Sequence, residues 1–212
     1  MPGRRSPRLV DWIAALPDLG MAVFFLAAWI DPSRFGDDVI TYLVLVMLLE
    51  FIVIHSAAFM GAVAFGDLQV QPLLKWGKPV GIVGLGAFYS LFVLGFCLGF
   101  HTWWPMLAFW GLTANRLLGA MLGGNTSEEN RQLVMGGWAV GVMAYLFGAF
   151  ATLFLPVPRL GIRGGLDGVG EGIWIDQPWK PVAMGVIYFG LVGWYELRWR
   201  KWYKPAGAVT PE

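Results

Sequence analysis

Two ionisable side chains of opposite charge, Glu50 and Arg116, lie within long apolar runs of this 212-residue chain. An ionisable group in a hydrocarbon layer costs about 2.5–3.5 kcal/mol, so it usually has a partner and often a function. An acid and a base at the same depth can form an ion pair, transfer a proton or bind a polar solute. We therefore take these two residues as the first candidates for a functional site.

Counting residues along the expected helices places further polar side chains at the level of this pair. Glu50 lies about 11 residues into the apolar run 39–66, which is roughly 16 Å deep at 1.5 Å per residue. Asn115 and Arg116 lie about 10 residues after Pro105 and reach the same level. The same count places three more hydroxyl groups near the middle of the layer: Ser90, Tyr145 and Tyr188.

We expect a polar centre in which Glu50 pairs with Arg116, while Asn115 and the tyrosine hydroxyls supply the remaining hydrogen bonds. Such a centre would line the pathway of a solute or an ion. In the alternative interpretation, Arg116 extends to the cytoplasmic boundary of the membrane and Glu50 is a protonated packing residue.

The two histidines do not suggest a shared cofactor. His55 follows Glu50 by five residues, which places it about 140° further around a helix. His101 is expected at the outer boundary, roughly 15–20 Å from the level of His55 along the helix axes. Because two axial ligands of one haem must reach one depth, we predict no bound cofactor and no metal site. A haem held by His55 or His101 alone stays open as an alternative.

Six apolar stretches must position these residues, and each is long enough to cross a bilayer. A hydrocarbon layer about 30 Å thick requires about 20 residues of helix. Charged residues make up 14% of the chain, against about 25% in soluble domains. We therefore predict an all-α membrane protein, a single transmembrane domain built as a six-helix bundle. The expected helices are 12–30, 39–66, 80–100, 105–122, 133–155 and 181–197.

The distribution of Lys and Arg predicts the orientation of this bundle. With six crossings, ten of the 15 Lys and Arg residues fall on the side of the two termini and four on the other. Positive residues collect on the cytoplasmic side, so we expect both termini there and a location in a plasma membrane, the bacterial inner membrane. The net charge of +1 gives no indication of a nucleic-acid partner. The expected partner is the lipid bilayer, and a homo-oligomer or a larger membrane complex stays open.

Small residues and one long connection complete the expected layout. Helices approach closely in lipid where small residues recur every four positions, which predicts contacts at Gly95 and Gly99 and along a stripe that includes Gly111. The outer loop 156–180 is rich in glycine, and loops of this length are usually functional or mobile. We expect it to form a flexible cover over the outer face.

These observations leave three hypotheses for function. The first is a small transporter or channel whose pathway passes the polar centre at Glu50, Asn115 and Arg116. The second is a non-catalytic subunit or assembly factor of a larger membrane complex, in which the small-residue stripes contact partners. The third is a haem-binding component of a membrane oxidoreductase. No enzyme signature stands out in the sequence, so we favour a protein that is not an enzyme.

Overall fold

The computed structural model describes residues 9–65, 77–122, 128–166, 168 and 171–198, and within these ranges it contains helices and no strand. Each of the six expected apolar stretches coincides with one long helix, and the ends differ by only a few residues. The long helices are α1 (Leu9–Ile30), α2 (Val39–Phe65), α3 (Gly77–Gly99), α4 (Trp104–Leu122), α5 (Glu128–Phe154) and α7 (Trp179–Arg198). Two short elements, η1 (Pro32–Phe35) and α6 (Ile173–Asp176), lie in connections.

Three of these helices are long and apolar enough to cross a membrane. They are α2 over Val39–Val63, α3 over Pro79–Gly99 and α5 over Met135–Phe154. The apolar part of α1 is shorter and covers Ala15–Ile30. The described part of the protein is therefore all-helical, and three of its helices could span a membrane.

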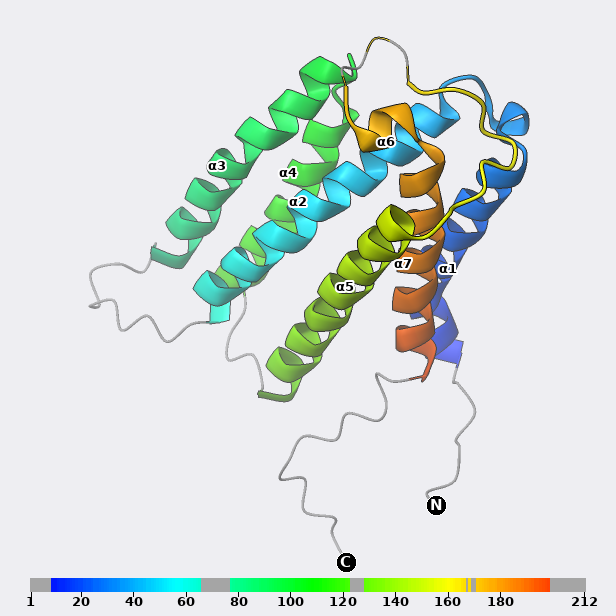
Figure 1. Ribbon diagram of the computed structural model, residues 1–212. Coiled ribbons are helices and arrows are strands. Elements are labelled where there is room, and N and C mark those ends of the chain that lie inside the picture. Colours follow the sequence, from blue (N-terminus) through cyan, green and yellow to red (C-terminus); the bar gives the residue numbers. More distant parts are fainter. Residues whose placement is uncertain (1–8, 66–76, 123–127, 167, 169–170, 199–212) are drawn as a thin grey trace, which may run out of the picture.

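The long helices pack in two groups that share α2 (Figure 1). In one group, α7 packs against both α1 and α5, and α2 contacts α7 and α5. In the other group, α3 and α4 form an antiparallel hairpin that packs on α2. Helix α2 therefore connects the hairpin to the rest of the bundle.

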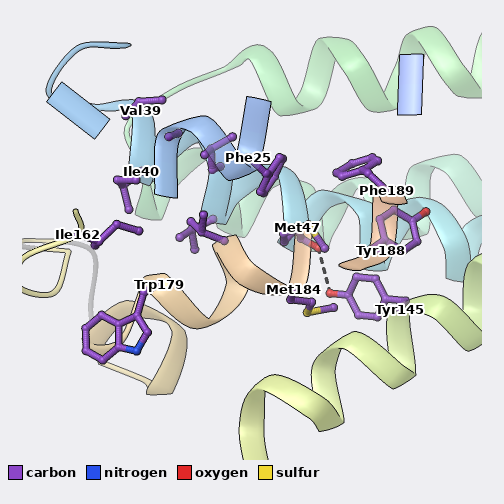
Figure 2. Packing of buried hydrophobic residues seen from close by; sticks show 14 of the residues in the cluster. Phe25, Val39, Ile40, Met47, Tyr145, Ile162, Trp179, Met184, Tyr188 and Phe189 are labelled. Atoms are coloured by element: carbon purple, nitrogen blue, oxygen red, sulfur yellow. Dashed lines mark hydrogen bonds between the residues drawn. The ribbon is translucent and has the colours of Figure 1, made fainter. Parts of the chain in front are cut away.

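Each group has its own apolar cluster. The first cluster joins α1, α2, α5 and α7 through residues that include Phe25, Met47 and Met184 (Figure 2). The second cluster joins α2, α3 and α4, and Leu49, Val93 and Phe109 belong to it. Helix α2 contributes different residues to the two clusters, so α7 and the α3–α4 hairpin pack against different faces of α2.

Close approach of α7 to α1 depends on two glycines of α7. A Cβ atom on Gly185 would collide with the ring of Phe25, and one on Gly193 would lie 2.8 Å from Leu19. Small residues allow this packing, as expected for helices in lipid. The predicted close contacts within this chain at Gly95, Gly99 and Gly111 are wrong, because no described atom beyond the local backbone of their own helix lies within 4 Å of a Cβ built there. The close contacts instead lie where a bulky side chain of the neighbouring helix faces a glycine.

The outer connection has more structure than the expected flexible cover. Trp29 at the end of α1 donates from Nε1 to the carbonyl of Pro158 at 3.0 Å, and its own carbonyl accepts from the Gly161 N–H at 3.0 Å. Ile162 is buried in the first apolar cluster, and the Leu166 N–H bonds to the carbonyl of Ile175 in α6. These contacts attach the described part of the loop to the end of α1 and to the start of the α6–α7 segment.

Candidate functional site

Tyr188, a member of the first apolar cluster, donates a hydrogen bond to a carboxyl group on another helix. Glu50 lies on α2 and is partly buried, and Tyr188 lies on α7 and is buried. The hydroxyl of Tyr188 donates to Oε2 of Glu50 at 3.0 Å. A hydrogen bond to an acidic group in an apolar environment contributes more than one in water, so this contact ties α2 to α7.

A second tyrosine completes the connection to α5. The hydroxyl of Tyr145 donates to the main-chain carbonyl of Met47 at 3.0 Å, which Figure 2 shows as a dashed line. A carbonyl oxygen has two lone pairs, so Met47 can accept this bond in addition to one within its helix. The rings of Tyr145 and Tyr188 meet edge to face, with centroids 5.8 Å apart. Helices α2, α5 and α7 thus meet around Glu50 through two aromatic side chains.

An acidic side chain of α1 lies within electrostatic range of this site. Asp18 on α1 interacts with Glu50 and with the hydroxyl of Tyr188. Glu196, near the end of α7, interacts in turn with Asp18. Among the side chains that the structure describes, Glu50 forms no ion pair. The surroundings of Glu50 therefore combine a second acidic side chain with apolar packing.

The expected basic partner of Glu50, Arg116, belongs to α4. Asn115 and Arg116 belong to α4, but their side chains lie outside the described residues. Helix α4 packs on the face of α2 that carries Leu49 and Ile52. Glu50 contacts α7 from another face of α2. The pairing of Glu50 with Arg116 stays a prediction, and the described partner of Glu50 is Tyr188.

The remaining sequence candidates lie on α2, on α3 and in the turn after α3. The Ser90 hydroxyl donates to the Gly86 carbonyl at 2.7 Å within α3. His55 is exposed on α2, where Nδ1 lies 3.1 Å from the carbonyl of Phe51. His101 is exposed in the turn after α3, with a positive φ of 52°. Within the described residues, no three His, Cys, Asp or Glu side chains form a group that could hold a metal ion.

Sequence reasoning missed Asp18, although the signal was present. Asp18 lies inside the apolar stretch 12–30, and an ionisable residue within such a stretch is a candidate by the rule that selected Glu50. Of the hydroxyl residues that the depth count placed near Glu50, Tyr188 bonds to Glu50, and the ring of Tyr145 contacts the ring of Tyr188.

The fold and this site together define a helical membrane protein with a tyrosine-bound carboxyl group inside its bundle. No protein family, characterised protein or solved structure matches the chain. The geometry of the chain itself is therefore the basis for assigning a function.

Proposed function

We propose that this chain is a six-span protein of the bacterial inner membrane with both termini in the cytoplasm, and that it works as a small transporter or channel. The six long helices and the excess of Lys and Arg on the side of the termini support this topology. Helices α1 and α7 run antiparallel side by side, so the start of α1 and the end of α7 lie at the same end of the bundle (Figure 1).

The hydrogen bond from Tyr188 to Glu50 is the observation that carries the proposal. A carboxyl group within an apolar cluster can bind and release a proton, and the tyrosine hydroxyl holds it in one orientation. Glu50 is then the proton-linked or gating group of the pathway, and Tyr188 and Tyr145 position it. From α4, Arg116 presents a fixed positive charge to a polar solute or anion, with Asn115 beside it. From α3, Ser90 contributes a hydroxyl group to the pathway at the depth of Glu50.

Proton flux into proteoliposomes tests this proposal. The purified chain is reconstituted with a pH-sensitive dye trapped inside, and a potassium gradient with valinomycin sets the membrane potential. We expect the wild type to move protons and Glu50→Gln to reduce the rate at least about tenfold, because a carboxamide accepts the Tyr188 bond but carries no exchangeable acidic proton. Asp176→Asn, an exposed carboxylate in α6, is the matched control and should leave the rate unchanged. Equal rates in wild type and Glu50→Gln, with both proteins folded by circular dichroism, would remove this role for Glu50.

The subunit or assembly-factor alternative has its own supporting observation. Gly95 and Gly99 lie four residues apart on α3, and no described atom would meet a Cβ at either position. An open pair of small residues at this spacing fits the close approach of a helix from another chain. Stoichiometric partners that co-purify in mild detergent, and that are lost on Gly95→Leu, would favour this function over transport.

The haem alternative involves His55 or His101, and the geometry at His55 shows which of its nitrogens is available. Its Nδ1 faces the Phe51 carbonyl, so Nε2 is the ring nitrogen that could bind iron. An absorbance spectrum of the purified protein decides this alternative, since a Soret band that His55→Ala removes is required for it.

A further inference from the structure

A pocket of about 380 Å³ lies between α1, η1 and the first turns of α2. Its volume falls in the range of roughly 300–1,000 Å³ that is usual for small-molecule sites. The pocket is open on one side, and neither Glu50 nor its tyrosine partners line it. It is therefore separate from the Glu50 site, and its occupancy does not depend on transport.

Three aromatic rings line this pocket. Phe24 of α1 and Phe35 of η1 meet edge to face with centroids 5.2 Å apart, and Tyr42 of α2 lies nearby on the lining. All three rings are exposed, with between 36% and 46% of each residue accessible. The faces of aromatic rings attract cations, and quaternary ammonium groups are commonly bound in aromatic cages.

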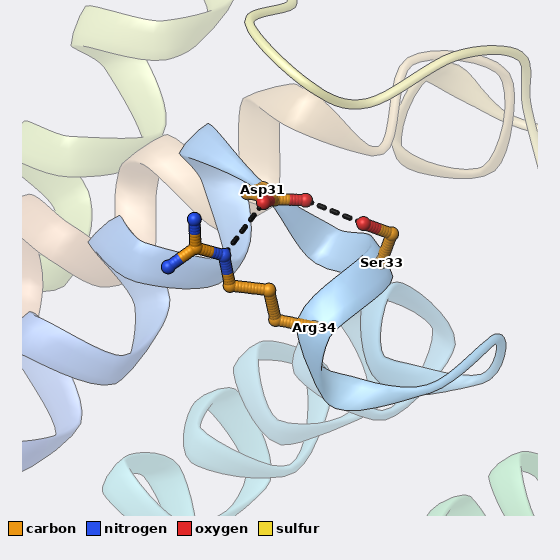
Figure 3. A network of polar contacts seen from close by, with 3 residues as sticks. All are labelled: Asp31, Ser33 and Arg34. Carbon is orange, nitrogen blue, oxygen red and sulfur yellow. Dashed lines mark hydrogen bonds and ion pairs between the residues drawn. The ribbon is translucent and has the colours of Figure 1, made fainter.

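The charge of the lining has one sign. Asp37 and Asp38 are the only ionisable groups on it apart from the Tyr42 hydroxyl, and within the described part of the chain neither carboxylate has an ion-pair partner. The nearest basic residue along the chain, Arg34, is held by Asp31 at 2.7 Å and is not part of the lining (Figure 3). The start of α2 contributes about half a positive charge, which two carboxylates outweigh. The pocket therefore complements a cation.

The depth of the pocket points to an amphiphile as the occupant. The carboxylates immediately precede Val39, where the most apolar span begins, and so lie at the level of lipid headgroups. The lining continues to Val46, about 12 Å further along α2, and to Met21 on α1. One end of the pocket is thus acidic and aromatic, and the other end is apolar.

We propose that this pocket binds the ammonium headgroup of a membrane phospholipid, of the phosphatidylethanolamine or phosphatidylcholine kind. The ammonium group lies against Phe35 and Tyr42 and is balanced by Asp37 and Asp38. The first part of an acyl chain follows the groove between α1 and α2 toward Val46.

Native mass spectrometry of the full chain, released from neutral detergent micelles, tests this proposal. The protein is incubated with equal amounts of phosphatidylethanolamine, phosphatidylcholine and phosphatidylglycerol that carry the same acyl chains. We expect the two ammonium lipids to be retained at least about five-fold over phosphatidylglycerol, in keeping with a desolvated cation–π contact. The double variant Asp37→Asn/Asp38→Asn should abolish this preference, and Phe35→Leu should reduce it.

A matched control shows whether the lipid preference depends on the carboxylates of the pocket or on the net charge of the protein. Glu171→Gln/Asp176→Asn removes two exposed acidic groups of the outer connection and should keep the preference. Equal retention of the three lipids by the wild type, or a preference that survives Asp37→Asn/Asp38→Asn, would overturn the proposal. It would also fail if choline chloride displaced the bound lipid at equal molar concentration, because the site would then take free cations rather than lipid.

Discussion

The hydroxyl of Tyr188 lies 3.0 Å from Oε2 of Glu50, a residue 138 positions earlier in the chain. The contact crosses from α7 to α2 at the first apolar cluster, to which Tyr188 belongs, and a hydrogen bond in such surroundings is stronger than one in water. It therefore contributes to helix packing whatever the protein transports or binds.

Loss of this donor should destabilise the bundle. Tyr188→Phe keeps the ring contacts and leaves Glu50 without its described hydrogen bond, which costs about 1–3 kcal/mol. Unfolding in mixed micelles of increasing dodecyl sulfate content, followed by circular dichroism, measures the change. Tyr42→Phe removes a hydroxyl from an exposed tyrosine and should change stability by less than about 0.5 kcal/mol. Equal effects of the two variants would show that the bond contributes nothing.

Gly185→Ala should separate α1 from α7. The added methyl group would collide with the Phe25 ring, and such overpacking costs about 1–3 kcal/mol. Gly190→Ala in the same helix is the matched control, since nothing lies within 4 Å of its Cβ. Alanine favours the helix interior by about 1 kcal/mol over glycine, so this control should be neutral or slightly stabilising. The same unfolding assay compares the two, and a stabilised Gly185→Ala would contradict the α1–α7 packing.

Trp29→Phe should loosen the outer connection. It removes the 3.0 Å bond from Nε1 to the Pro158 carbonyl, which contributes about 0.5–1.5 kcal/mol. Trypsin cleavage after the exposed Arg163 should then be faster, by up to about tenfold if cleavage requires local opening. Fragments identified by mass spectrometry give the rate at this bond. Trp103→Phe, at an exposed tryptophan outside this contact, should leave the rate as in the wild type.

The carboxyl group of Asp31, beyond the end of α1, should titrate below its usual range. Hydrogen bonds from Ser33 and Arg34 lower the pKa of Asp31, with Ser33 the larger cause. Because the folded-state pKa is the lower one, the interaction stabilises the fold at pH values above the unfolded pKa of about 3.9 and is lost as the pH falls through the folded pKa.

Carboxyl-carbon NMR titration of the protein in micelles measures this pKa. Ser33→Ala and Arg34→Gln should each raise the pKa of Asp31 toward its ordinary value, and the double variant should raise it furthest. A pKa of Asp31 that neither substitution moves would show that the contacts in Figure 3 do not form.

The helices could be predicted from the sequence because the length of an apolar run is a local property. The depth of a residue along its helix could be predicted for the same reason, because a fixed rise per residue places Tyr188 near the level of Glu50 without knowledge of the fold. The partner that each side chain meets could not be predicted, because it depends on which helices are neighbours. This is why the Met47 carbonyl was not foreseen as the partner of Tyr145, and why the close glycine contact lies at Gly185.

The division of the bundle into two apolar clusters separates the hairpin from the carboxyl site. The described contacts of Glu50 and Tyr188 belong to the cluster of α1, α2, α5 and α7, whereas α3 and α4 pack on another face of α2. A rigid tilt of the α3–α4 hairpin would therefore break contacts around Phe109 and leave the hydrogen bond from Tyr188 to Glu50 intact. Movement of the hairpin and the loss or gain of the Tyr188–Glu50 contact would then involve different sets of side chains.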